Sequence, residues 1–211
     1  MQLRIKICGI TNLQDALAAA NAGADALGFM FYDRSKRWVT ADAVAKITRE
    51  LPPFVLRVGV FVDASPETVR DVAGTCGLTA LQFHGGESPQ YCSQFSLPVI
   101  KAIRLADKSS LSQLADYETS ALLLDSAVPG QLGGTGEKGD WQRAREANTA
   151  GRRIILAGGL TPANVAQAVR EVQPYGVDVS TGVESAPGRK DQQKVAAFIR
   201  AARGAAAEMP G

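Results

Sequence analysis

Histidine and cysteine are scarce in this sequence, and neither occurs at a spacing that binds metal. One His and three Cys stand among the 211 residues, without a Cys-x-x-Cys or His-x-x-x-His pair. Zinc sites need several such ligands close together, so the composition argues against a transition-metal site. The cysteines Cys8, Cys76 and Cys92 also lack disulfide-like spacing, which favours a reducing setting and a cytoplasmic location.

Long apolar runs and clustered charges are missing too. No apolar run is long enough to cross a membrane, and the N-terminus does not have the pattern of a signal peptide. The 23 Lys and Arg residues are scattered among 21 Asp and Glu residues, for a net charge of +2. This balance predicts no nucleic-acid partner and no membrane partner, whereas a small anionic ligand needs only local positive charge.

The composition is that of a globular protein with one core. Hydrophobic residues make up 45% and charged residues 21%, as in ordinary folded domains. No low-complexity stretch or linker divides the chain, so we expect residues 1–211 to form a single domain. We expect the tail Gly204–Gly211 to be frayed.

Strand patterns alternate with helix patterns along the whole chain. Apolar runs begin near residues 4, 26, 56, 80, 98, 121, 153 and 177, and a helical pattern follows each. The helices are expected at Asn12–Ala22, Asp42–Leu51, Pro66–Cys76, Ser88–Phe95, Ser109–Tyr117, Asp140–Asn148, Pro162–Val172 and Lys190–Arg203. Such alternation predicts an α/β fold with a parallel sheet. Eight units predict a closed (β/α)8 TIM barrel, and an open doubly wound sheet is the alternative.

Polar residues at the ends of the predicted strands favour the barrel. They are Cys8, Asp63, His84, Arg104, Asp125 and Ser180. In a barrel these ends converge on one mouth, which carries the active site. At Cys8, the positive end of the next helix (capped by Thr11) and the neighbouring Lys6 can favour a thiolate. Position alone leaves Cys8 either a small buried hydrophobe or a reactive group.

Two glycine-bearing loops follow the last two predicted strands. Gly158 and Gly159 follow the seventh strand, and Ser180, Thr181 and Gly182 follow the eighth. In barrels these loops often bind phosphate through backbone N–H groups, so we expect a phosphorylated small molecule; the alternative is simple turn glycines. The stretch 130–139 also matches G-x-G-x-x-G, but its distance from the strand argues against a dinucleotide site, and we expect it to cover the substrate.

Other candidates each have a structural alternative. Asp125 ends an apolar strand and is placed to be a general acid if burial raises its pKa, or else a capping or salt-bridge residue. Arg37 ends a cationic run that is either solvated or holds a carboxylate through a bidentate fork. We expect a binding role for His84. Lys6 and Asp178 are expected inside the barrel, as a structural ion pair or as site residues.

Taken in order, these motifs resemble the phosphoribosylanthranilate isomerases of tryptophan biosynthesis. The matching segments are Lys6–Thr11, Arg34–Arg37, Gln82–Gly85, Asp125, Gly133–Gly136 with Asp140 and Trp141, Leu156–Leu160, Asp178–Glu184 and Pro187–Asp191. The resemblance implies a TIM barrel, monomeric or homodimeric, that carries out an Amadori rearrangement without a cofactor. It implies Asp125 as general acid, Cys8 as general base and Arg37 as the ligand of the anthranilate carboxylate, with the last two loops on the phosphate.

This sequence departs from the usual family pattern at four positions. Gly139 replaces a Phe, Phe83 a Leu, Lys36 a Pro, and Thr181 a Ser. None of these changes removes a proposed catalytic group, although Gly139 changes the packing expected of the loop after the sixth strand.

Two other functions fit the same pattern less well. The sister isomerase of histidine biosynthesis resembles a two-fold repeat with carboxylates at both catalytic positions, whereas this chain has Cys8 and no evident half-repeat. A catalytically silent sugar-phosphate-binding protein is compatible with the fold. The presence of both Cys8 and Asp125 argues against it.

Overall fold

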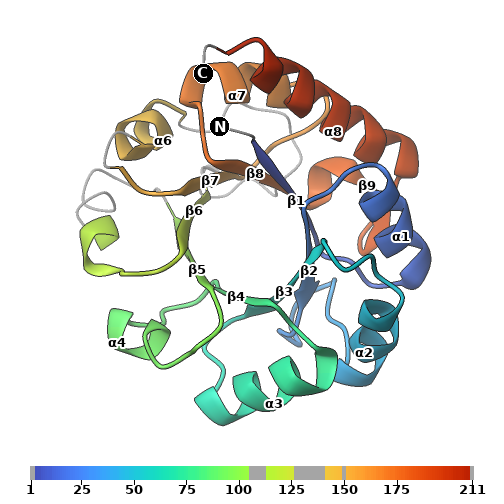
Figure 1. Ribbon diagram of the computed structural model, residues 1–211, viewed down its shortest axis with the longest axis vertical. Coiled ribbons are helices and arrows are strands. Elements are labelled where there is room, and N and C mark those ends of the chain that lie inside the picture. The colour runs from blue at the N-terminus through green and yellow to red at the C-terminus, as the bar shows by residue number, and fades with distance from the viewer. Residues whose placement is uncertain (1–2, 105–112, 126–140, 149–150, 210–211) are drawn as a thin grey trace.

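The chain forms a closed ring of parallel strands surrounded by helices (Figure 1). The computed structural model describes residues 3–104, 113–125, 141–148 and 151–209. The barrel strands are β1 (Arg4–Cys8), β2 (Ala26–Met30), β3 (Leu56–Phe61), β4 (Ala80–Phe83), β5 (Val99–Arg104), β6 (Ala121–Asp125), β7 (Ile154–Ala157) and β8 (Gly176–Val179). Each strand begins within a residue of its predicted start.

The pairing of β1 with β8 closes the ring. Lys6 lies opposite Asp178 and Ile7 lies opposite Val179 in this parallel pair, while β1 also pairs with β2. Figure 1 shows β1, in blue, beside β8, in orange. The predicted TIM barrel is confirmed, and the open doubly wound sheet is excluded.

The helices form the outer layer of the barrel (Figure 1). They are α1 (Leu13–Asn21), α2 (Ala41–Arg49), α3 (Pro66–Cys76), α4 (Pro89–Cys92), α6 (Trp141–Asn148), α7 (Val165–Val172) and α8 (Gln192–Ala207). Two 3-10 helices, η1 (Gln113–Asp116) and η2 (Thr181–Val183), and a hairpin of β9 (Glu184–Ala186) and β10 (Arg189–Lys190) complete the described elements.

The core has two parts because strand side chains alternate in direction. One part lies between strands and helices and includes Ile5, Ile7 and Phe198. The other fills the barrel interior with Ala26, Val58, Ala80, Ile100, Ala102, Ala121, Leu123, Ile155 and Ala157. The barrel interior is therefore occupied by side chains, and active sites in such barrels lie at the C-terminal strand ends.

Several predicted helix boundaries are wrong. Asn12 rather than Thr11 caps α1, since its side-chain oxygen accepts from the Asp15 backbone N–H at 2.9 Å. The Thr11 hydroxyl instead donates to the Gly188 carbonyl. The helix predicted at Ser88–Phe95 is reduced to α4. Within the described part of Ser109–Tyr117 the structure has only η1, and the predicted loop at 130–139 lies outside the described residues.

The last helix extends beyond its predicted end. α8 continues to Ala207, so the tail expected to fray from Gly204 is helical over residues 204–207. Ala202 and Ala205 are buried against the core. The small side chains on this face let the end of α8 pack closely against the core. This packing offsets the lower helix propensity of Gly204.

A substitution at Ala205 tests whether the end of α8 is packed. Ala205→Asp places an unpaired carboxylate where the native side chain is 2% exposed, and we expect it to lower the free energy of unfolding by about 2–4 kcal/mol. The control Gly204→Ala adds a Cβ that meets nothing within 4 Å, so it should be neutral or stabilising. Urea unfolding measures both. A loss below about 0.5 kcal/mol for Ala205→Asp, the size of an ordinary surface change, would mean that this turn is frayed.

Candidate functional site

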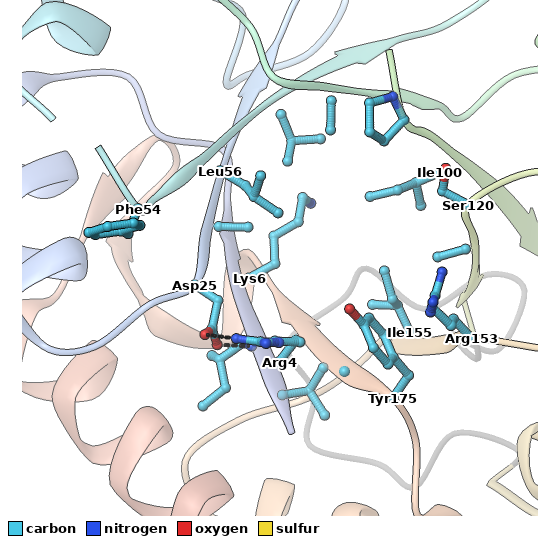
Figure 2. Close-up of a pocket in the computed structure, with 18 residues that line it drawn as sticks. Arg4, Lys6, Asp25, Phe54, Leu56, Ile100, Ser120, Arg153, Ile155 and Tyr175 are labelled. Atoms are coloured by element: carbon cyan, nitrogen blue, oxygen red, sulfur yellow. Dashed lines mark hydrogen bonds and ion pairs between the residues drawn. The ribbon is translucent and has the colours of Figure 1, made fainter. Parts of the chain in front are cut away.

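Two cavities lie at opposite ends of the barrel. The larger, about 490 Å³, is lined at the N-terminal strand ends by side chains such as Leu56, Ile100, Ile155 and Tyr175, as Figure 2 shows. The smaller, about 210 Å³, is lined by the C-terminal strand ends and the loops after them. Barrel enzymes carry their chemistry at the C-terminal end. The smaller cavity is therefore the candidate site despite its size, and we call it the mouth pocket.

All ten residues predicted to form the site line the mouth pocket. They are Cys8, Arg37, His84, Asp125, Gly158, Gly159, Asp178, Ser180, Thr181 and Gly182. These residues come from strands β1, β6 and β8 and from the loops after β2, β4, β7 and β8. The barrel thus brings together groups up to 174 residues apart in the sequence, from Cys8 to Gly182.

Cys8 is buried next to an ion pair between β1 and β8. Lys6 Nζ lies 2.8 Å from Asp178 Oδ1, with both side chains at least 90% buried. A Cβ on the neighbouring Gly28 would lie 2.7 Å from Cys8 Sγ and 3.1 Å from Lys6 Nζ, so the thiol and the ammonium share one small space. Lys6 and Asp178 therefore form the structural ion pair that was one of the two alternatives expected for them. Asp178 also lines the mouth pocket.

This environment favours the thiol form of Cys8 rather than the thiolate. Burial raises the pKa of the Cys8 thiol, Lys6 opposes the change, and Asp178 adds to it. Burial alone would lower the pKa of Lys6, but Asp178 and Cys8 outweigh it and the pKa is raised. The expectation that the strand tip favours a thiolate is therefore wrong in direction, because it counted the helix end and Lys6 but not the burial of the thiol.

Asp125 and His84 lie close together at the ends of β6 and β4. His84 Nε2 is 3.8 Å from Asp125 Oδ2, and about a quarter of the Asp125 side chain is exposed. The buried Gln82 amide lies 3.1 Å from His84 Nδ1. When the amide nitrogen donates to Nδ1, the ring proton is on Nε2 and faces Asp125. The contact between Gln82 and the His84 ring was not predicted from the sequence.

A buried ion pair supports the loop that carries His84. Lys101 Nζ on β5 donates to Glu87 Oε2 at 2.9 Å and to the Gly85 carbonyl at 2.7 Å. Glu87 in turn accepts from the backbone N–H groups of Gly85 and Asp63. Sequence analysis missed this pair, because Glu87 lies in a polar loop where an exposed side chain is the ordinary expectation.

The loops after β7 and β8 touch through their backbones. A Cβ at Gly182 would lie 1.9 Å from the Leu160 carbonyl oxygen, so only glycine allows this approach. Gly158 and Gly159 have φ angles of +88° and +65°, which also favour glycine. The Ser180 hydroxyl oxygen is buried and has no hydrogen-bond partner within the described part of the chain. The two loops therefore form one surface with an unsatisfied polar group.

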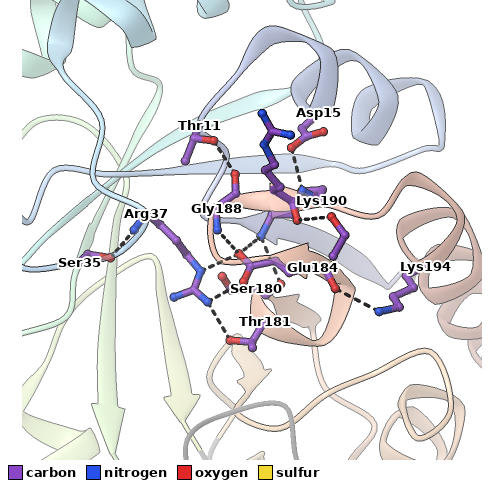
Figure 3. Close-up of polar contacts among 12 residues, drawn as sticks. Thr11, Asp15, Ser35, Arg37, Ser180, Thr181, Glu184, Gly188, Lys190 and Lys194 are labelled. Atoms are coloured by element: carbon purple, nitrogen blue, oxygen red, sulfur yellow. Dashed lines mark hydrogen bonds and ion pairs between the residues drawn. The ribbon is translucent and has the colours of Figure 1, made fainter.

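Arg37 crosses the pocket edge and pairs with Glu184 (Figure 3). Its Nε and Nη2 donate to the two Glu184 carboxylate oxygens at 2.7 Å each, and Nη2 also donates to the Thr181 hydroxyl at 3.2 Å. The bidentate edge expected to hold a ligand carboxylate is therefore occupied by Glu184. The segment Asp178–Glu184 was recognised as a motif, but Glu184 was not expected to contact Arg37.

The described residues contain neither a metal-binding cluster nor a membrane-spanning helix. Among them, no three His, Cys, Asp or Glu side chains lie close enough together to hold a metal ion. No helix in residues 3–104, 113–125, 141–148 and 151–209 is both long enough and apolar enough to cross a membrane.

Comparison with known proteins identifies the family. A family model described as N-(5'phosphoribosyl)anthranilate (PRA) isomerase matches residues 5–201. The N-(5'-phosphoribosyl)anthranilate isomerase of Trichlorobacter lovleyi is 53% identical over 201 residues, which cover 95% of this chain and 98% of the relative. A crystal structure of the Thermotoga maritima phosphoribosyl anthranilate isomerase superposes with a TM-score of 0.92 at 42% identity, covering 96% and 100% of the two chains.

Two further structures concern ligand and assembly. One, 41% identical with a TM-score of 0.85 over 96% of this chain and 100% of the other, is a phosphoribosyl anthranilate isomerase in complex with reduced 1-(o-carboxyphenylamino)-1-deoxyribulose 5-phosphate. Another, 39% identical with a TM-score of 0.84 and the same coverage, contains monomers generated from the dimeric Thermotoga maritima enzyme. Fold, motifs and near-complete coverage agree, and the chain belongs to the N-(5'-phosphoribosyl)anthranilate isomerase family.

Proposed function

We propose that Cys8 and Asp125 carry the proton transfers of the isomerase reaction at the mouth pocket. As a member of its family, the chain is an enzyme of tryptophan biosynthesis that converts N-(5'-phosphoribosyl)anthranilate into 1-(2-carboxyphenylamino)-1-deoxyribulose 5-phosphate. The observation that carries the proposal is the convergence of Cys8, Asp125 and the two glycine loops on one cavity. Acid, base and anion-binding groups at one site are what this rearrangement requires.

The reaction needs an acid first and a base second. Asp125 donates a proton to the ribose ring oxygen as the C1–O bond breaks, which leaves a Schiff base between C1 and the anthranilate nitrogen. The Cys8 thiolate then removes the proton from C2, and the electron pair forms the C1=C2 bond of an enolamine. The enolamine tautomerises to the ketone when its hydroxyl loses a proton and C1 gains one. His84, beside Asp125, is placed to bind the sugar at this edge of the pocket.

The Cys8 thiol first loses its own proton to solvent at the pocket, and its raised pKa makes the resulting thiolate a strong base for the C2 proton. A thiolate of high pKa is a stronger base, although less of it is present at neutral pH. Lys6 stabilises the thiolate once it forms, and Asp178 keeps Lys6 charged. We assign Asp178 to the substrate-facing wall as well, since it lines the pocket beside Cys8.

The ligand's anionic ends have separate binding groups. We assign the phosphate to the loops after β7 and β8, which is supported by the backbone contact at Gly182 and the unsatisfied Ser180 hydroxyl. We assign the anthranilate carboxylate to Arg37, through the guanidinium nitrogens that Glu184 leaves available.

Assembly, domain extent and location are further proposals. We propose one domain over residues 1–211, supported by a single ring of strands that runs from Arg4 to Val179. A monomer and a homodimer both fit the family, since a Thermotoga maritima relative is dimeric. We propose a cytoplasmic enzyme, because all three cysteines are free thiols and the role of Cys8 requires one.

Substitution of the acid or the base tests the proposal. We expect Cys8→Ser and Asp125→Asn each to lower kcat by about a hundredfold or more, while the product analogue binds nearly as in the native enzyme. Loss of substrate anthranilate fluorescence measures turnover. Near-native kcat in either variant would exclude the role assigned to that residue. A native enzyme no faster than the spontaneous background would instead favour a silent sugar-phosphate-binding protein.

The ionisation of Cys8 gives a second prediction. Thiolate absorbance of the native protein, minus that of Cys8→Ser, should rise only at a pH above the ordinary cysteine range. In Asp178→Asn the rise should shift to lower pH, because the carboxylate that opposes the thiolate is removed. The control Asp71→Asn changes an exposed residue and should leave the pH of the absorbance rise unchanged. An ordinary or lowered pKa for Cys8 in the native protein would contradict the account.

The contact between the two loops gives a third. Gly182→Ala forces the loops apart at Leu160, so we expect KM to rise about tenfold or more, with inhibition by inorganic phosphate weakened in parallel. The control Gly74→Ala in α3 adds a Cβ that meets nothing within 4 Å and should keep both values. If KM and phosphate inhibition stay native in a folded Gly182→Ala, the phosphate lies elsewhere.

A further inference from the structure

We infer that Glu184 is a positioning residue that determines specificity, because it fixes which edge of Arg37 faces the substrate carboxylate. A guanidinium can hold a carboxylate through its Nε–Nη2 edge or through its Nη1–Nη2 end. Glu184 takes the first edge with two bonds of 2.7 Å. The substrate carboxylate is then directed to Nη1, for which no hydrogen bond appears within the described part of the chain.

Glu184 is itself held firmly in place. Its side chain is only 5% exposed, and Oε1 accepts from Lys190 Nζ at 3.0 Å and from the Gly188 backbone N–H at 3.3 Å besides Arg37. Lys190 Nζ also donates to the Ser180 carbonyl at 3.2 Å. Figure 3 shows this cluster of β9, β10 and the loop before them around Arg37. The orientation of Arg37 is therefore tied to the loop assigned to the phosphate.

The methylene groups of Arg37 are fixed as well as its guanidinium group. A Cβ at Gly9 would lie 2.5 Å from Arg37 Cδ and 2.9 Å from the Ser180 hydroxyl. The methylene groups of Arg37 thus lie directly over Gly9, the residue that follows Cys8. Because the methylene groups and the guanidinium of Arg37 are both held, Nη1 keeps one position relative to Cys8. The reaction requires this, since it is sensitive to small displacements of the substrate.

The charges leave the cluster attractive to an anion. Arg37 and Lys190 supply two positive charges against the single negative charge of Glu184. Burial favours the neutral form of Glu184, but its bonds to Arg37 and Lys190 outweigh burial and lower its pKa, so it stays ionised at neutral pH. Burial lowers the pKa of Lys190, although its pairing with Glu184 opposes the change; while Lys190 stays protonated, one net positive charge remains for the substrate.

A purely structural role for Glu184 is the alternative, since it also belongs to the β9–β10 hairpin. The Glu184 carbonyl accepts from Lys194 Nζ at 3.1 Å, a bond that no side-chain change removes. The two roles differ in their dependence on Arg37. A positioning residue has little effect once Arg37 is absent, whereas a structural residue has the same effect with or without it.

A double-mutant cycle with two ligands tests the inference. The ligands are the reduced carboxyphenylamino deoxyribulose phosphate and its counterpart made from aniline, which lacks the carboxylate. Their Kd values are measured by calorimetry for the native protein, Glu184→Gln, Arg37→Ala and the double variant. Glu208→Gln, in an exposed ion pair with Arg170, is the matched control. Glu184→Asp keeps the charge and provides a folded variant if Glu184→Gln is unstable.

Positioning predicts a specific pattern. Glu184→Gln should raise the Kd of the carboxylate ligand about tenfold, as expected for the loss of one oriented charged contact, with kcat changed less than KM. The double variant should bind no more weakly than Arg37→Ala. The aniline ligand should bind all variants within about threefold of native, and Glu184→Asp should be intermediate.

Other results overturn it. Removing a negative charge beside an anion site should tighten binding if charge alone mattered, so an unchanged or lowered Kd for Glu184→Gln excludes positioning. Additive losses, or equal weakening of both ligands, assign Glu184 to the hairpin instead. Because the role of Glu184 rests on the proposed role of Arg37, a native Kd for Arg37→Ala excludes both. A weakened Arg37→Ala with a native Glu184→Gln excludes only the role of Glu184.

Discussion

The pairing of β1 with β8 is the constraint on which the site depends. It closes the barrel and places Lys6 opposite Asp178, with the Cys8 thiol in the same buried space. A buried ion pair adds little net stability, because both charges lose their hydration. Its consequence is chemical: a paired ammonium is kept beside a thiol that the surroundings hold in its neutral form. The pairing of β1 with β8 thus sets the basicity of Cys8.

The same arrangement recurs around the mouth. Lys101 and Glu87 form a second buried ion pair under the loop that carries His84, and Lys190 and Glu184 form a third beneath Arg37. Each links a pocket-lining residue to the rigid barrel or to the hairpin after β8. Functional groups on loops are precise only when their own partners are fixed. These three pairs provide that support next to Cys8, His84 and Arg37, which all line the mouth pocket.

Much of this arrangement follows from local sequence patterns. Apolar runs located the strands, and the residues at their C-terminal ends, including Cys8 and Asp125, line the mouth pocket as parallel strands require. The pairing of Lys6 with Asp178 was one of the expected alternatives, but the burial of Cys8 and the other long-range pairs did not follow. A cysteine at a strand end gives no sign in the sequence of how far its thiol is buried, and burial is the main cause of its raised pKa. Likewise, Arg37 and Glu184 meet across 147 residues, and the short strands of β9 and β10 leave no clear alternation to recognise.

The division of labour between Cys8 and Asp125 is the central claim, and one isotope measurement tests it most directly. Single-turnover rates with substrate deuterated at ribose C2 can be compared with rates for unlabelled substrate in Cys8→Ser and Asp125→Asn. If Cys8 removes the C2 proton, Cys8→Ser is limited by that step and shows a primary isotope effect. Asp125→Asn is limited by ring opening and shows none. The reverse pattern, with the isotope effect confined to Asp125→Asn, would contradict the account.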